Sequence, residues 1–292
     1  MLNRRVPIGL ASLCALLGLA APFLRAADGD PKEIFRRALR NDARNRELER
    51  TYTYVERHET RTLDARGAVT HRESTTWDVV PLRRSMYRRL TQRDDKPLSP
   101  KEERQQEAAR QKTEAARQKA DALRDAETPA GRQKRLAARE RARQQEQRDK
   151  DEIVEGFDLR LAGEEQIDGI PVWVIDGAPR AGYKFKPSQL TGIVSRMKGR
   201  IWIAKSDYQP VRIEAETTGT LSFGGVLARI YKGTRVHVEY TRVNGEVWLT
   251  KRFGFTVSGR ILLLKGLHEE EDSVYSGFRK FSADSRLVTG EP

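Results

Sequence analysis

The stretch FDLRLAGEEQIDGIPVWVID, residues 157–176, decides the fold class of this 292-residue chain. Apolar and charged side chains alternate along its first five residues, and Asp168-Gly169 separates that segment from a second apolar one. Alternation with a period of two places successive side chains on opposite faces of a strand, and Asp-Gly is typical of a tight hairpin turn. The same alternation recurs over 211–216 and 235–240. One buried and one wet face per strand predict an antiparallel sheet.

Further strands and one helix extend this pattern toward the N-terminus. Residues 52–62, 69–80 and 85–92 predict three more strands, and the whole chain offers about ten or eleven. An antiparallel sheet of that size usually curls or closes. Asp30 before Pro31 and an apolar stripe from Ile34 to Leu39 predict an amphipathic helix over about 31–48. The expected fold is mainly β (α+β): a curved antiparallel sheet forming an incomplete β-barrel covered by this helix.

Residues 98–150 interrupt the strand pattern with a different composition. They contain 15 Lys and Arg, 10 Asp and Glu, and only three large apolar side chains, Leu98, Leu123 and Leu136. A capping box at Ser99 and a break at 128–131 predict a charged helical hairpin of about 100–127 and 132–153. Three residues spaced by seven predict a weak coiled-coil seam between its arms: Ala109, Ala116 and Leu123. Alanine buries little area, so the hairpin is expected to project into solvent.

The first residues predict a secretory signal peptide over 1–27. Arg4 and Arg5 precede an apolar run from Ile8 to Leu24 that ends among small residues. Cleavage after Ala20, Ala26 or Ala27 and an uncleaved membrane anchor remain alternatives. The single cysteine, Cys14, lies inside the run, so lipidation is not favoured and the exported chain would have no disulfide or thiol chemistry. We therefore expect a periplasmic protein, secreted across the inner membrane.

These segments divide the chain into five parts. Residues 28–97 would hold the helix and first strands, 98–154 the hairpin insertion, 155–284 the remaining strands and 285–292 a tail. The formal net charge is +13, of which the signal contributes three, the insertion five and the remaining body five. The 37% of hydrophobic residues is enough for a sizeable core and excludes a wholly disordered chain.

The sequence contains no recognisable catalytic, metal or cofactor motif. There is no nucleophile elbow, phosphate-binding loop or paired-histidine spacing. The four histidines are interpreted as solvated strand residues: His58, His71, His237 and His268. The acidic run 268–272 alternates faces if it is a strand, so we interpret it as a charged edge strand rather than a cation site. The hairpin lacks interleaved aromatics and its acids nearly match its bases, which argues against nucleic acid. It is either a solvated helical face or a docking element whose partner, through residues 98–154, is an anionic membrane surface or an envelope protein.

The expected inner face of the sheet is the remaining candidate site. Its bulky apolar residues are Trp77, Phe157, Leu159, Trp173, Trp202, Phe223, Tyr240, Phe253 and Phe255. They either fill a core or line a cavity for a lipid acyl chain, because a sheet too wide to be filled by its own side chains must admit a helix or a ligand.

Two stretches resemble a known family. Residues 161–175 form a strand, an Asp-Gly turn and a strand; residues 199–203 and 208–214 form a Trp-bearing strand, a turn and a Pro-x-Arg strand. Both resemble periplasmic lipoprotein-carrier and outer-membrane lipoprotein-sorting proteins of the LolA/LolB-like fold, over about 31–97 and 155–282. The resemblance implies an unclosed, helix-covered barrel whose cavity holds acyl chains, without catalysis. The insertion and Ala204, where the family usually has Asp, depart from it.

Two functions follow as hypotheses. The first is a non-enzymatic periplasmic protein that binds lipid or lipoprotein acyl chains on the inner face, in outer-membrane lipoprotein sorting. The alternative is an envelope interaction or stress-regulatory module that uses the same fold as a scaffold and the basic hairpin as a docking element.

Overall fold

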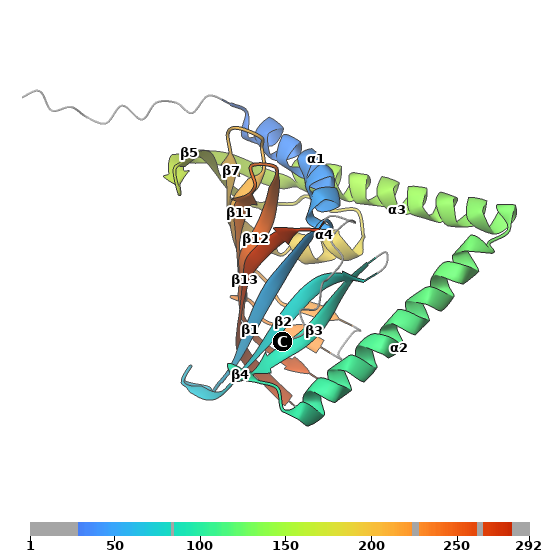
Figure 1. Ribbon diagram of the computed structural model, residues 1–292. Helices are drawn as coiled ribbons and strands as arrows, with labels where there is room; N and C mark the ends of the chain where they lie inside the picture. Colours follow the sequence, from blue (N-terminus) through green and yellow to red (C-terminus); the bar gives the residue numbers. More distant parts are fainter. Residues whose placement is uncertain (1–28, 83–84, 224–227, 262–264, 282–292) are drawn as a thin grey trace, which may run out of the picture.

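The computed structural model describes residues 29–82, 85–223, 228–261 and 265–281 (Figure 1). The signal peptide predicted over 1–27 and the tail predicted over 285–292 lie outside them. The described residues form four helices: α1 (Pro31–Glu49), α2 (Pro100–Asp125), α3 (Pro129–Gly156) and α4 (Gln189–Val194). The same residues form thirteen strands: β1 (Tyr52–Leu63), β2 (Val69–Leu82), β3 (Ser85–Arg93), β4 (Lys96–Pro97), β5 (Phe157–Ile167), β6 (Ile170–Pro179), β7 (Met197–Ala204), β8 (Pro210–Thr217), β9 (Leu221–Phe223), β10 (Ala228–Ile230), β11 (Arg235–Val243), β12 (Val247–Ile261) and β13 (Lys265–Lys280).

All these strands belong to one antiparallel sheet. Its order is β4-β3-β2-β1-β13-β12-β11-β8-β7-β6-β5, with β9 and β10 attached beside β12. The first strand, β1, pairs along its length with the last strand, β13. Within the described residues β4 and β5 are the two ends of this order and do not pair with each other. The predicted fold class, an unclosed antiparallel sheet with helical cover, is therefore confirmed.

The turns follow the predicted chemistry. Asp168 and Gly169 between β5 and β6 have φ angles of 49° and 78°, and Asn244 and Gly245 between β11 and β12 have 51° and 69°. Two successive positive φ angles define the type I′ turn, whose twist matches that of the flanking strands. These turns fix the register of both hairpins and so fix which side chains share a face.

Helix α1 covers one face of the sheet, which we call the inner face. Asp30 accepts a hydrogen bond from the Lys32 backbone amide at 3.0 Å and caps the helix. From this helix, Ile34 and Ala38 pack on Trp173, Ile175 and Ile203 of the sheet. The opposite, outer face has its own apolar cluster, formed by Val172, Val174, Trp202, Ala204, Val211 and Trp248.

Helices α2 and α3 form the predicted insertion, but their arms diverge. Figure 1 shows them spreading apart from the turn between them, and they do not pack along their lengths. The predicted seam is therefore wrong: Ala109 and Ala116 are exposed, and Leu123 is 67% exposed. Two alanines and one leucine bury too little apolar area to hold two arms with many charges together.

Both arms of the insertion are attached to the body. The Arg117 guanidinium of α2 donates to the carbonyl oxygens of Leu82, Ser85 and Met86 at 3.0, 3.3 and 3.0 Å. In α3, Lys150 Nζ donates to the Leu39 carbonyl of α1 at 2.9 Å. The apex between these attachments extends away from the sheet.

The acidic run 268–272 does not lie on an edge strand. It belongs to β13, which lies between β1 and β12 near the middle of the sheet. The expected alternation holds, since Glu269 and Glu271 face inward while Glu270 and Asp272 face outward. Sequence could not show this placement, because it results from pairing between the two ends of the chain.

Candidate functional site

The inner face is filled at one end of the sheet. There, Leu159 and Trp173 pack under α1. Phe157 is 9% exposed and meets the ring of Phe185 edge-on, with ring centroids 6.0 Å apart. This half of the inner face is therefore an ordinary packed core.

The neighbouring half of the inner face is open. Five apolar residues there are only partly buried, and we call them the apolar strip: Ile213, Val236, Val238, Phe253 and Phe255. They share a face because Val236 pairs with Phe255, and Val238 with both Phe253 and Ile213. The rings of Phe253 and Phe255 lie 6.0 Å apart along β12. The strip is thus a continuous apolar surface across three strands.

A cavity of about 350 Å³, which we call the inner cavity, adjoins the strip. Its walls come from five strands, β12, β13, β1, β2 and β3, all through inner-face residues. The lining residues are Glu56, His58, Thr75, Trp77, Arg88, Phe253, Glu271, Ser273 and Tyr275. Phe253 belongs to both the strip and the cavity, so the two form one site with an apolar and a polar end.

The polar end is partly organised by internal contacts. Arg88 donates to Glu56 at 2.8 Å and lies 4.8 Å from the centre of the Trp77 ring. His58 Nδ1 lies 2.7 Å from Ser273 Oγ, and its Nε2 lies 3.9 Å from the Glu271 carboxylate. Burial raises the pKa of Glu271 above its ordinary value.

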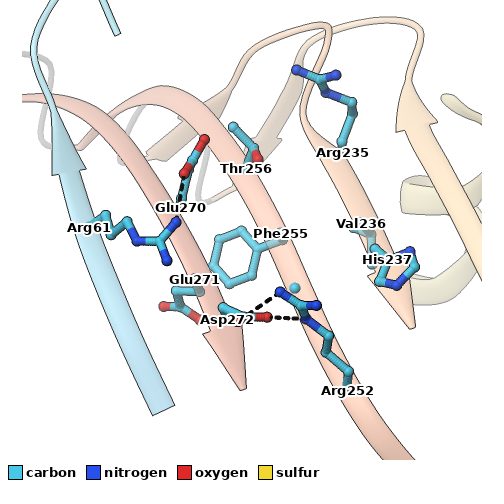
Figure 2. Close-up of a pocket in the computed structure, with 11 residues that line it drawn as sticks. Arg61, Arg235, Val236, His237, Arg252, Phe255, Thr256, Glu270, Glu271 and Asp272 are labelled. Atoms are coloured by element: carbon cyan, nitrogen blue, oxygen red, sulfur yellow. Dashed lines mark hydrogen bonds and ion pairs between the residues drawn. The ribbon is translucent and has the colours of Figure 1, made fainter. Parts of the chain in front are cut away.

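A second hollow, of about 460 Å³, is lined mainly by outer-face residues of the same strands. Figure 2 shows its charges meeting in pairs: Arg252 binds Asp272 at 2.6 and 3.0 Å, and Arg61 lies 3.6 Å from Glu270. Because these charges neutralise one another and apolar groups are few, this hollow is a poor site for an acyl chain.

The structure separates the residues predicted to line a lipid cavity. Trp77, Phe253 and Phe255 lie in the open half of the inner face, while Phe157, Leu159 and Trp173 lie in the filled half. The two interpretations, filled core and open cavity, thus each describe one half of the face. The side chain of Phe223 lies outside the described residues.

Trp202 and Tyr240 do not belong to the inner face, so their assignment to the cavity is corrected. Trp173 pairs with Ile203, which places the adjacent Trp202 on the outer face. A bulge after Glu239 shifts the alternation of β11, and Tyr240 packs against the outer cluster that contains Trp202. Ala204, the position where a carboxylate was expected from the family pattern, is fully buried in that cluster.

Sequence reasoning missed the polar end of the site. Glu271, Ser273 and Tyr275 are spaced by two along β13, which is the signal that they share a face. Their proximity to Glu56 and His58 of β1 depends on the long-range pairing of β1 with β13.

Across the described residues, no group of three or more His, Cys, Asp or Glu is placed to hold a metal ion. No helix within those same ranges is long and apolar enough to span a membrane.

Fold and site together define a helix-covered, unclosed antiparallel sheet with an amphipathic groove on its inner face. No family model matches the chain, and no curated protein is similar to it in sequence.

Among solved structures, the chain is similar to a domain assigned to outer membrane lipoprotein sorting from Vibrio parahaemolyticus, with 11% identity, 88% of this chain and 96% of that chain covered, and a TM-score of 0.32. It is similar to a DUF1329 family protein from Desulfovibrio piger, with 12% identity, coverage of 88% and 96%, and a TM-score of 0.28. It is also similar to a LolA superfamily protein from Nitrosomonas europaea, with 12% identity, coverage of 90% and 98%, and a TM-score of 0.26. Similarity at this level gives no information on what this chain binds.

Proposed function

We propose that this protein is a non-enzymatic, periplasmic lipid- or lipoprotein-binding protein that holds an acyl chain on the apolar strip. The observation that carries the proposal is the half-buried apolar surface of β8, β11 and β12, which lies beyond the part of the inner face that α1 fills. Bulky apolar side chains facing the inside of a curved sheet, with a cavity beside them, suit a flexible apolar ligand.

Apolar contact sets the energetic scale of such a site. A fully buried methylene gains about 0.8 kcal/mol, and an open groove covers roughly half of the chain's surface. A chain of about 14 methylenes would then gain about 6 kcal/mol before the entropic cost of association, which is itself at least about 4 kcal/mol. Apolar contact with the strip alone therefore predicts weak, readily reversible binding.

Titration of delipidated protein with a fluorescent long-chain alcohol tests the proposal. Phe253→Gln and Phe255→Gln remove ring surface from the strip and are expected to weaken binding about fivefold or more each. The matched control is Val274→Gln, because Val274 lies on β13, faces outward and is 39% exposed. Binding by the control should match that of the unmodified protein. Absence of saturable binding to the delipidated protein would refute the proposed function.

The location and cargo belong to the same proposal. A signal peptide over 1–27 would take the chain across the inner membrane, and lipoproteins bound for the outer membrane carry the acyl chains that the strip would accept. Fractionation of cells that produce the full chain, followed by N-terminal sequencing, tests the export and the cleavage. Recovery of the uncut chain in the cytoplasm would contradict it.

A second candidate function is docking of the insertion on an envelope surface. The observation that favours it is the apical half of α3, which carries six cationic side chains and one acidic one over 132–143 and extends away from the sheet. Anionic headgroups attract such clusters by about 1 kcal/mol per charge near the surface.

Vesicle cosedimentation separates this function from the first. Replacing Arg132, Arg139, Arg141 and Arg143 by glutamine should abolish binding to phosphatidylglycerol vesicles while binding of the long-chain alcohol is retained. Equal sedimentation of this variant and the unmodified chain would remove the docking candidate.

A further inference from the structure

We propose that the inner cavity binds an organic ammonium group, so that the ligand of this protein is an amphiphile with a cationic amine in its head and an apolar chain on the strip. This inference rests on the proposed lipid-binding function and adds the chemical class of the headgroup.

The cavity combines the two kinds of group that hold ammonium ions. Three aromatic rings, those of Trp77, Phe253 and Tyr275, share its walls with two carboxylates, Glu56 and Glu271. Aromatic faces attract ammonium groups through the ring quadrupole, and carboxylates attract them through charge. Both effects strengthen where water is partly excluded.

One of the carboxylates already shows this recognition inside the protein. The Arg88 guanidinium binds Glu56 at 2.8 Å while lying over the Trp77 ring at 4.8 Å from its centre. A cation held between a carboxylate and an indole is the arrangement that an ammonium ligand would need. Glu56 and Trp77 are therefore engaged by Arg88, which leaves Glu271 as the carboxylate that can bind a ligand.

Glu271 has no such cation among the residues that the structure describes. No lysine or arginine of those residues forms an ion pair with it, and the basic side chain beside it is the His58 ring, whose Nε2 lies 3.9 Å from the carboxylate and which is charged only when protonated. The His58 ring is already engaged through Nδ1 with Ser273 at 2.7 Å. The Glu271 side chain is only 25% exposed, so the carboxylate is partly desolvated without a compensating full charge. A bound ammonium would supply that charge.

Hydroxyl oxygens around the carboxylate complete the site. Ser273 and Tyr275 follow Glu271 on the same face of β13, and Thr75 lies two strands away on β2, opposite His58 of β1. They can accept hydrogen bonds from the N–H groups of an ammonium ion. A carboxylate headgroup in the same place would be repelled by Glu271 and, at longer range, by Glu269, which faces the same side.

The cavity opens directly onto the apolar strip. Phe255 is the cross-strand partner of Glu271, and Phe253 is the partner of Ser273. Cross-strand partners lie about 5 Å apart, so a headgroup at Glu271 places the first methylenes of its chain on the two rings. The site therefore selects the orientation of an amphiphile as well as its charge.

Three probes with the same ten-carbon chain test the inference by calorimetric titration of the delipidated full chain: decylamine, decanol and sodium decanoate. We expect decylamine to bind about tenfold more tightly than decanol, and decanoate to bind most weakly. Glu271→Gln should remove the preference for the amine, so that decylamine and decanol bind about equally. Glu270→Gln is the matched control, because Glu270 is the next residue on β13 but faces outward toward Arg61.

The outcomes distinguish the two levels of the proposal. Equal binding of decylamine and decanol, or a preference for the amine that survives Glu271→Gln, would overturn the headgroup assignment and leave the acyl-chain function standing. Failure of all three probes to bind would refute the acyl-chain function and the headgroup assignment with it. Thermal unfolding of both variants checks that each is folded.

Discussion

Glu59→Gln should destabilise the protein measurably and in a pH-dependent manner. Glu59 lies on the outer face of β1, and its side chain is 3% exposed. It accepts hydrogen bonds from Arg57 at 3.0 Å, from Arg61 at 2.8 Å and from Arg72 at 2.6 Å. These three arginines hold the pKa of Glu59 at about 2, despite the opposing effect of burial, against an ordinary value of 4.5.

The pKa shift sets the size of the effect. A lowering from 4.5 to about 2 corresponds to at most about 3 kcal/mol of folding free energy. The side chains of the arginine partners are 31% to 59% exposed, so solvent screening reduces this to about 2 kcal/mol. Because the folded pKa is lowered, the contribution is complete above about pH 4.5 and is lost as the pH falls through about 2.

Urea unfolding of both proteins at pH 7 and at pH 3 measures this contribution. The variant should be about 2 kcal/mol less stable at pH 7, and the difference should fall to about half at pH 3. Glu73→Gln is the control, since the Glu73 side chain is 62% exposed, and it should change stability by less than about 0.5 kcal/mol at either pH. A difference between Glu59→Gln and the unmodified protein that is the same at both pH values would refute the reasoning.

Three further substitutions test other parts of the fold. Gly199→Ala should lower stability by about 2 kcal/mol or more in thermal unfolding, because the added Cβ would lie 2.4 Å from the backbone carbonyl oxygen of Glu214; an unchanged melting temperature would contradict this packing. Ile34→Ala should cost about 3 kcal/mol in urea unfolding, since this side chain of α1 is 4% exposed against the inner face, and a loss under about 0.5 kcal/mol would mean that α1 does not close the inner face. Arg117→Ala should accelerate limited proteolysis within 100–156 with little change in global stability, whereas Leu123→Ala, at a 67% exposed position, should not; equal cleavage of both would show that Arg117 does not anchor the insertion.

The amino-acid sequence predicts the local elements of this fold closely. The helix expected over 31–48 is α1, Pro31–Glu49, and the strand expected over 85–92 is β3, Ser85–Arg93. These elements carry local signals, such as a cap at Asp30 and a turn at Asp168-Gly169, that need no information from distant residues.

The sequence does not predict which faces of distant strands coincide. In β7 the residues Ile201, Trp202 and Ile203 are all apolar, so alternation does not show which of them face inward. Only the pairing of Trp173 with Ile203 places Trp202 on the outer face. For Tyr240 the alternation changes face at a bulge after Glu239, and no turn residue in the sequence signals this bulge. A bulge of one residue moves every following side chain to the other face.

The polar end of the site was beyond sequence reasoning for a related reason. Glu56 and Glu271 are more than 200 residues apart and meet only because β1 and β13 pair. Alternation predicts that the residues of the acidic run divide between the two faces of the sheet. The residues that each face contacts depend on how distant strands pair, which alternation does not predict.

Native mass spectrometry of the protein purified from its own cells, without detergent, tests the central claim most directly. Binding of an acyl chain on the apolar strip predicts a bound lipid mass that is released on unfolding, that is lost in Phe253→Gln combined with Phe255→Gln, and that persists in Val274→Gln. A protein that carries no lipid and takes up none from added vesicles would contradict the account.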